Sequence, residues 1–262
     1  MLHLLVPLCL ALFAAAPRAA QPPTASQVAR AVEDRDTGKD SRSEFRMKLF
    51  DRRGRARERA LSLLTLRRGE GDRLLIRFTY PNDIRGTGFL VWEHPDQDDE
   101  RFLYLPSLGR VRRIAGSEAQ ESFVGSDFSY EDIGGREFDE YTYALLGDNA
   151  SWTAPDGAVR PAYRLESTRR DKSAEFPRVV SLVLKDSFVV VSADVFNRRN
   201  EKQKVYSVKR LQQVQGIWTI FESVMTNDLD KTRTELVVEK VAYNTGLKDE
   251  AFSRRELEGA AK

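Results

Sequence analysis

Residues 73–80 read RLLIRFTY, and this stretch decides the fold class. Aliphatic and aromatic side chains in succession favour an extended strand, and a strand directs successive side chains to opposite faces. Both faces of this strand are therefore apolar, as expected of a strand that is covered on both sides. Three further segments have the same character: Phe89–Trp92, Phe102–Leu105 and Ile217–Phe221.

So much apolar strand surface has two interpretations. One is a sandwich or barrel whose interior is filled by its own side chains. The other is a sheet that curls around a cavity and holds an apolar ligand in it. Both interpretations stay open at this point.

Strand patterns with turn residues between them continue along the chain on both sides of residues 73–80. Strands at hairpin spacing predict a mainly β fold with an antiparallel sheet in one domain. We expect short helices only at Thr24–Val32, with Ser26 as its cap, and at Asp249–Leu257. The other predicted strands are Phe45–Leu49, Ala60–Leu66, Gly86–Trp92, Arg101–Leu105, Gly109–Ile114, Tyr141–Leu146, Ala158–Thr168, Val179–Leu184, Phe188–Phe196, Lys204–Leu211, Ile217–Met225 and Arg233–Tyr243.

The chain begins with an apolar run, Leu2–Ala16, followed by small residues up to Ala20. This run is too short to span a membrane and ends as an export signal does. We expect residues 1–20 to be a cleaved signal peptide and residues 21–262 to form one exported, periplasmic domain. No later stretch has the length of a transmembrane helix.

The composition argues against several classes of partner and of chemistry. Lys and Arg number 42 against 40 Asp and Glu, so a formal net charge of +2 gives no strong attraction to nucleic acid. Removal of the signal peptide would leave no cysteine and one histidine, His94. Thiol catalysis and a histidine-rich metal site are then excluded, and no glycine-rich phosphate loop indicates a nucleotide. We expect no cofactor, no bound metal and no enzymatic activity.

Two acidic stretches were considered as sites. The loop of residues 96–100, with Asp96, Asp98, Asp99 and Glu100, has oxygen ligands for calcium but lacks the spacing of a known calcium loop, and a solvated hairpin tip is favoured. In the second stretch a hydrolase could use Asp127, Glu131 and Asp132 as general acid and base, although one short stretch defines no such geometry.

The densest basic cluster is Arg110, Arg112 and Arg113, beside apolar strand residues. Guanidinium groups form paired hydrogen bonds with phosphate or carboxylate, so this cluster could contact a lipid headgroup or an acidic partner. A solvated strand face is the simpler explanation, and both remain open.

The stretches YLPSLGRVRRI (Tyr104–Ile114) and SFVGSDFSYED (Ser122–Asp132) together resemble the outer-membrane lipoprotein-sorting protein family. The resemblance covers nearly all of the chain after the signal peptide. It implies a strongly curved antiparallel sheet, an incomplete barrel covered by short helices and loops, as in the carrier LolA and its receptor LolB. The arginine that locks the lid of the carrier has no counterpart here. Within the second stretch we expect Ser126 or Asp127 to cap a turn, with Phe128 and Tyr130 packed inside.

The resemblance implies a periplasmic carrier that shields the acyl chains of a lipid or lipoprotein during transfer toward the outer membrane. The alternative is a non-catalytic accessory subunit that docks on an inner-membrane lipid exporter of the resistance-nodulation type. We expect one face of each apolar strand to line the cavity. The expected lining residues are Leu74, Ile76, Phe78, Phe89, Val91, Phe102, Tyr104, Leu182, Leu184 and Phe221.

Overall fold

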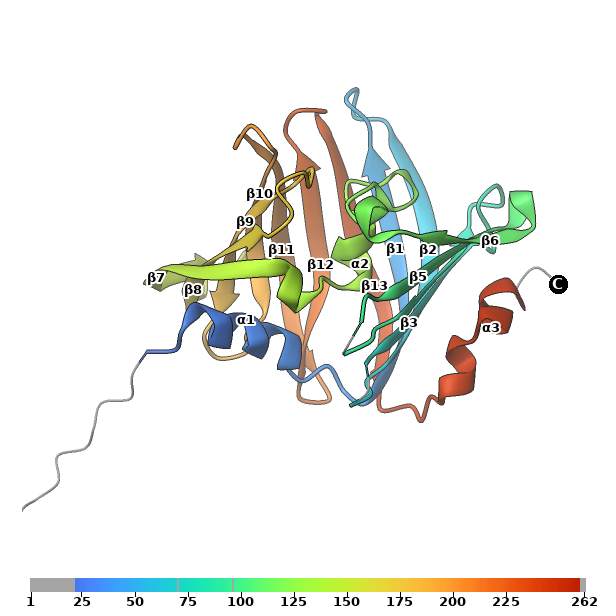
Figure 1. Ribbon diagram of the computed structural model, residues 1–262, viewed down its shortest axis with the longest axis horizontal. Coiled ribbons are helices and arrows are strands. Elements are labelled where there is room, and N and C mark those ends of the chain that lie inside the picture. Colours follow the sequence, from blue (N-terminus) through green and yellow to red (C-terminus); the bar gives the residue numbers. More distant parts are fainter. Residues whose placement is uncertain (1–21, 70, 96, 260–262) are drawn as a thin grey trace, which may run out of the picture.

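The computed structural model describes residues 22–69, 71–95 and 97–259. Its strands form one thirteen-stranded antiparallel sheet in the order β6-β5-β4-β3-β2-β1-β13-β12-β11-β10-β9-β8-β7 (Figure 1). The sheet is curved but not closed, because β6 and β7 remain as its edges. The expected fold class, an incomplete antiparallel barrel, is confirmed. The strands are β1 (Asp40–Phe50), β2 (Ala56–Leu66), β3 (Arg73–Tyr80), β4 (Gly88–Trp92), β5 (Glu100–Leu105), β6 (Arg110–Ile114), β7 (Tyr141–Thr153), β8 (Val159–Arg169), β9 (Arg178–Leu184), β10 (Val190–Phe196), β11 (Lys202–Val214), β12 (Ile217–Asn227) and β13 (Thr232–Tyr243).

The helical segments lie on both sides of this sheet. Figure 1 shows α1 (Ala25–Asp34) and α2 (Tyr130–Gly134) within its curve and α3 (Arg254–Glu258) outside it. The remaining helical turns are η1 (Pro106–Leu108), η2 (Gly116–Glu118), η3 (Phe123–Gly125), η4 (Phe138–Glu140) and η5 (Asp249–Phe252).

Irregular pairing accounts for much of the curvature. Register shifts interrupt the ladders of β1 with β13, of β2 with β3 and of β11 with β12, and such bulges increase the local twist. In addition, β12 pairs with β13 only over residues 222–227. The other half of β13 pairs with β1 alone, so the sheet is split there between β12 and β13.

The inner face of the sheet is the face that α2 and η3 cover. Phe78 and Phe89 of this face pack against Phe123 of η3, with ring centroids 5.8 and 5.5 Å apart. Tyr130 of α2 lies 5.3 Å from the Phe89 ring. These aromatic contacts form a dry core at the β3–β4 end of the hollow.

The outer face of the same strands is covered by η5 and α3. Phe252 and Leu257 are buried against Leu75 and Leu90. The indole Nε1 of Trp92 donates a hydrogen bond of 2.7 Å to the carbonyl oxygen of Phe252. Strands β3 to β5 are therefore apolar on both faces because the chain itself covers both faces.

This arrangement shows where each of the two interpretations of the apolar strands applies. Around β3, β4 and β5 the protein's own side chains fill the space, as in a closed core. The cavity described below lies beside this core, between the inner face and α1. Both interpretations therefore apply, each to a different part of the hollow.

The helix termini differ in detail from the sequence-based expectation. Thr24, not Ser26, caps α1, because Thr24 has extended backbone angles and its hydroxyl accepts the amide of Gln27 at 3.2 Å. In the same way Ser129, not Ser126 or Asp127, caps α2. Phe128 and Tyr130 are buried, as predicted.

The predicted closing helix consists of η5 and α3, because Ser253 between them has extended backbone angles. The predicted signal peptide, residues 1–20, lies outside the described residues. Within the described residues, no helix combines the length and apolar character needed to cross a bilayer.

Replacement of Leu257 by Ala tests the covering of the outer face. Leu257 is fully buried, so Leu257→Ala should lower the free energy of unfolding by about 2 to 5 kcal/mol, measured by urea denaturation. Leu229→Ala is the matched control. Leu229 is 53% exposed, so this substitution should change the free energy of unfolding little. Equal effects of the two substitutions would contradict the packing of α3 on the sheet.

Candidate functional site

A cavity with two chambers lies between the inner face of the sheet and the segments that cross it. The first chamber, of about 360 Å³, lies beside the split between β12 and β13, and the linker from α1 to β1 borders it. Its side walls are mainly apolar. They include Phe45, Leu63, Leu74, Val91, Leu236, Val238 and Val241.

The second chamber, of about 430 Å³, lies between α1, α2 and the inner face of β8 to β13. Tyr206, Ser223 and Leu236 line both chambers, so the two adjoin at these residues. The apolar lining of the second chamber includes Ala29, Val32, Ile133, Leu165, Val190, Ala193, Val195 and Met225.

Short side chains leave this space open. Ser181 and Ala193 face each other on the neighbouring strands β9 and β10, and Ser223 lies on β12; all three are buried on the inner face. Protein interiors seldom contain voids much larger than a water molecule, so buried positions of this kind usually carry larger side chains. The cavity thus follows from small residues at inward positions, whereas the core at β3 and β4 carries Phe and Ile there.

Charged side chains line the end of the first chamber. Arg67 donates to the backbone carbonyl of Glu33 at 2.8 Å and to that of Arg35, so it closes the last turn of α1. Arg73 donates to the carbonyl of Glu93 at 2.9 Å. Both guanidinium groups thus hold backbone segments in place.

Arg35 differs from these two arginines. It follows α1 and lines the first chamber, where Nη1 donates one long hydrogen bond of 3.4 Å to the carbonyl of Trp218. Burial lowers the pKa of Arg35, and the phenol groups of Tyr206 and Tyr243 act on its charge. Within residues 22–69, 71–95 and 97–259 no carboxylate forms an ion pair with it.

Glu93 is the second unusual charge of this chamber. Burial, with the nearby carboxylates of Asp72 and Asp99, raises its pKa to about 7. The amide of Asp72 donates a long hydrogen bond of 3.4 Å to the Glu93 carboxyl group, which compensates only weakly for the burial of its negative charge. Near neutral pH this carboxyl group is therefore only partly ionised.

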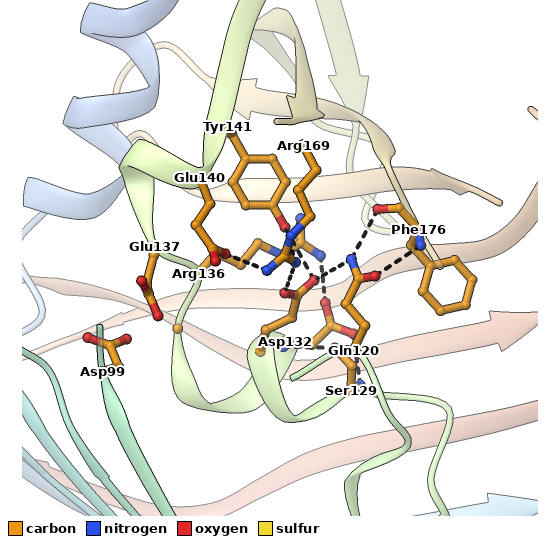
Figure 2. Close-up of polar contacts among 12 residues, drawn as sticks. Asp99, Gln120, Ser129, Asp132, Arg136, Glu137, Glu140, Tyr141, Arg169 and Phe176 are labelled. Atoms are coloured by element: carbon orange, nitrogen blue, oxygen red, sulfur yellow. Dashed lines mark hydrogen bonds and ion pairs between the residues drawn. The ribbon is translucent and has the colours of Figure 1, made fainter. Parts of the chain in front are cut away.

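A buried polar network fixes α2 against the sheet (Figure 2). Arg169 of β8 forms an ion pair of 2.5 Å with Glu131 of α2. The Tyr141 hydroxyl and the Gln120 amide also donate to Glu131, at 3.3 and 3.2 Å. Gln120 in turn accepts the backbone amide of Phe176 at 3.1 Å. The network connects α2 with β7, β8 and the segment before β9.

The acids considered for a hydrolase all have structural partners. Asp127 accepts hydrogen bonds from the hydroxyls of Thr232 and Thr234 at 2.5 and 2.7 Å. Asp132 accepts the amide of Ser129 and pairs with Arg136 at 2.6 Å (Figure 2). With Glu131 bound by Arg169, these groups anchor the segment before and within α2 and do not face each other as an acid–base pair.

Five of the predicted lining residues lie on the inner face. Leu74 and Val91 line the first chamber. Ile76, Phe78 and Phe89 lie on the same face but are buried beneath η3 and α2, in the core and not in the cavity.

The other five predicted lining residues lie elsewhere, which corrects the prediction. Phe102 and Tyr104 are on the outer face with Phe252 and Leu257, because Phe89 pairs with Leu103 and inward positions of β5 are therefore odd-numbered. The predicted inward face of β5 is therefore wrong, because a shift of one residue along a strand exchanges its two faces.

The predicted inward residues of β9 and β12 are also wrong. Ser181 lines the second chamber, so Leu182 and Leu184 point to the opposite face of β9. Phe221 lies at a register shift of β12, and the Arg210 guanidinium covers its ring at 4.7 Å. The sequence reasoning missed Tyr206, Ser223 and Leu236, because the half-solvated pattern around Tyr206 gave no sign of a cavity.

The remaining candidates lie away from the cavity. Arg110, Arg112 and Arg113 are exposed on edge strand β6, where Arg112 pairs with Glu118 at 2.8 Å. In the acidic loop, Asp99 pairs with Arg101 at 2.8 Å, and Asp96 lies outside the described residues. The described part of the chain contains no cluster of acidic, histidine or cysteine side chains suited to a metal ion.

Comparison with known proteins identifies relatives over most of the chain. A family model described as "-like: Uncharacterized protein" matches residues 70–259. A DUF1329 family protein from Desulfovibrio piger is 31% identical with a TM-score of 0.79, covering 89% of this chain and 97% of that one. No curated protein sequence matches.

Two further solved structures share the fold. An outer membrane lipoprotein-sorting protein domain from Vibrio parahaemolyticus is 27% identical with a TM-score of 0.79, covering 89% of this chain and 98% of that one. A LolA superfamily protein from Nitrosomonas europaea is 17% identical with a TM-score of 0.67, covering 90% and 100% of the two chains. The expected LolA-like architecture is thus confirmed.

Replacement of Arg169 by Met tests the buried network. The change leaves the Glu131 carboxylate buried without its partner, so the free energy of unfolding should fall by about 3 to 5 kcal/mol. The double variant Arg169→Met/Glu131→Gln should recover part of this loss in the same urea titration. Additive losses would show that the two groups do not interact.

Replacement of Glu93 by Gln tests the raised pKa. The folded chain holds a proton on Glu93 between about pH 4.5 and 7 that the unfolded chain releases, so stability should decline as pH rises through this window. Glu93→Gln should reduce that decline, to which Glu33 with a pKa of about 7 also contributes, and raise the melting temperature at pH 8. Glu175→Gln, at an exposed position, is the control and should change neither. An unchanged pH profile for Glu93→Gln would disprove the assignment.

Proposed function

Since the chain belongs to the LolA-like family of outer-membrane lipoprotein-sorting and DUF1329 proteins, we propose that it is a non-catalytic carrier of acylated molecules. In this proposal the two-chamber cavity shields acyl chains from water in the periplasm, during transfer toward the outer membrane.

The observation that carries the proposal is the size and lining of the cavity. Each chamber has a volume within the range of roughly 300 to 1,000 Å³ that small-molecule sites have, and apolar side chains form most of its walls. Burial of a hydrocarbon chain contributes about 0.8 kcal/mol per methylene group. A chain that enters only one chamber would therefore already gain several times the thermal energy.

The split in the sheet supports a route into the cavity. The part of β12 before Glu222 has no backbone hydrogen-bond ladder with β13, and the first chamber lies beside this gap. The gap is bridged by side chains, including a hydrogen bond of 2.8 Å between Thr219 and Tyr243. Side-chain movement there costs less than breaking a ladder of backbone hydrogen bonds.

The alternative function is that of an accessory subunit on an inner-membrane exporter. It is favoured by Arg110 and Arg113, which are exposed on β6. This strand is an edge of the sheet, so within the described residues one of its two hydrogen-bonding edges has no partner strand. An edge strand of this kind can accept a strand from a partner. In this alternative the cavity carries no cargo.

Replacement of Ser223 by Leu distinguishes the two functions. Ser223 lies where the chambers adjoin, so the larger side chain should narrow the connection and weaken binding of a fluorescent fatty acid at least tenfold. The control is Ser151→Leu, at an exposed position of β7. Circular dichroism and melting temperature check that both variants fold.

Wild-type protein purified from cells should also release lipid into an organic extract, detected by mass spectrometry. Lipid-free preparations that ignore fluorescent fatty acids would count against the carrier and favour the accessory subunit. Equal binding by the two leucine variants would show that the ligand does not use this cavity.

A further inference from the structure

Arg35 has no structural task that accounts for its place in the cavity. Its single hydrogen bond, to the Trp218 carbonyl, is long at 3.4 Å. Arg67 and Arg73 by contrast donate several hydrogen bonds to backbone carbonyls. A guanidinium group has five N–H donors, and most of those of Arg35 thus have no partner within the described residues.

The surroundings of Arg35 make this costly for the empty protein. Removal of water from a charged group is unfavourable unless a counter-charge or hydrogen bonds replace the water. Burial is the main influence on the Arg35 charge and lowers its pKa, while Arg67 adds repulsion and Asp36 a weak attraction. Within the described residues no carboxylate forms an ion pair with this group.

The hydroxyl groups of the chamber already have partners, since the Thr219 hydroxyl donates to the Ile217 carbonyl at 3.1 Å. The hydroxyls of Tyr243 and Thr219 lie 2.8 Å apart, and both residues line the chamber together with Arg35. Tyr206 lies at the junction with the second, more apolar chamber. A guanidinium group beside apolar walls matches a molecule with one anionic end and one hydrocarbon end.

We propose that Arg35 is the headgroup-binding residue of this cavity, and that the cargo is an acyl lipid with an anionic headgroup, a carboxylate or a phosphate. This inference rests on the proposed carrier function. The headgroup pairs with the Arg35 guanidinium in the first chamber, and the acyl chain passes Tyr206 and Leu236 into the second chamber.

The carboxylates of the same chamber do not oppose this assignment. Asp72 lies 4.0 Å from the Nε of Arg67 and accepts the amide of Arg68 at 2.9 Å. Glu93, with its pKa raised to about 7, is partly neutral at the pH of binding. Arg35 therefore remains the unpaired charge that an incoming anion meets.

The test compares three ligands that share one chain length and differ in the headgroup. Palmitate carries a carboxylate, palmitoyl lysophosphatidic acid a phosphate, and monopalmitoylglycerol no charge. Affinities are measured at pH 7.4 by displacement of a fluorescent fatty-acid probe and by calorimetry. The wild-type protein should bind at least one anionic ligand about 10- to 100-fold more tightly than the neutral one. The better anion identifies the headgroup chemistry.

Arg35→Gln should remove this preference and leave the affinity for monopalmitoylglycerol unchanged. Arg35→Lys should restore part of it, because the charge returns without the paired geometry. The variant Arg52→Gln, at an exposed turn, is the matched control and should behave as wild type. Arg35→Gln should also raise the melting temperature of the lipid-free protein, since an uncompensated buried charge is removed.

The outcomes separate this inference from the carrier function. If the neutral ligand binds as tightly as both anions, or if Arg35→Gln weakens all three equally, Arg35 does not bind the headgroup although the carrier function stands. If none of the three ligands binds to wild-type protein, both proposals fail. A lower melting temperature for Arg35→Gln would show that Arg35 is a structural residue.

Discussion

Burial of both faces of strands β3 to β5 is the constraint on which the rest of the structure depends. These strands cannot face water on either side without a large loss of hydrophobic stabilisation. The chain meets this requirement with two short segments, η3 and α2 on the inner face and η5 and α3 on the outer face. Because this end of the hollow is filled, the open volume lies beside it and contacts β3 and β4 only at residues such as Leu74 and Val91.

Two different kinds of packing thus occur on one continuous inner face. Aromatic rings interlock around Phe89, whereas Ser181, Ala193 and Ser223 leave space under α1. The ion pair between Arg169 and Glu131 connects α2 with β8, and α2 contributes Tyr130 to the core and Glu131 to the cavity lining.

Three arginines of the structure differ in how far the protein itself uses their hydrogen-bonding groups. Arg67 and Arg169 have their hydrogen-bonding capacity used by carbonyls and carboxylates. Arg35 is partly buried, and its guanidinium group donates one long hydrogen bond. A buried charge that the protein leaves uncompensated destabilises the empty state, and selection can retain such a group where a ligand completes its contacts.

The sequence by itself determined the strands and their antiparallel arrangement, because alternation and turn residues are local properties. The incomplete barrel was implied by the family resemblance, and the burial of Phe128 and Tyr130 was expected within the stretch that carries it. The sequence also indicated that Leu74 and Val91 line the cavity. Only the tertiary structure decided which face of each strand points inward, since a bulge or a one-residue change of register reverses the faces of Phe102 and Leu182. The position of Arg35 was likewise beyond sequence reasoning, because whether a charge is paired depends on residues that only folding brings close to it.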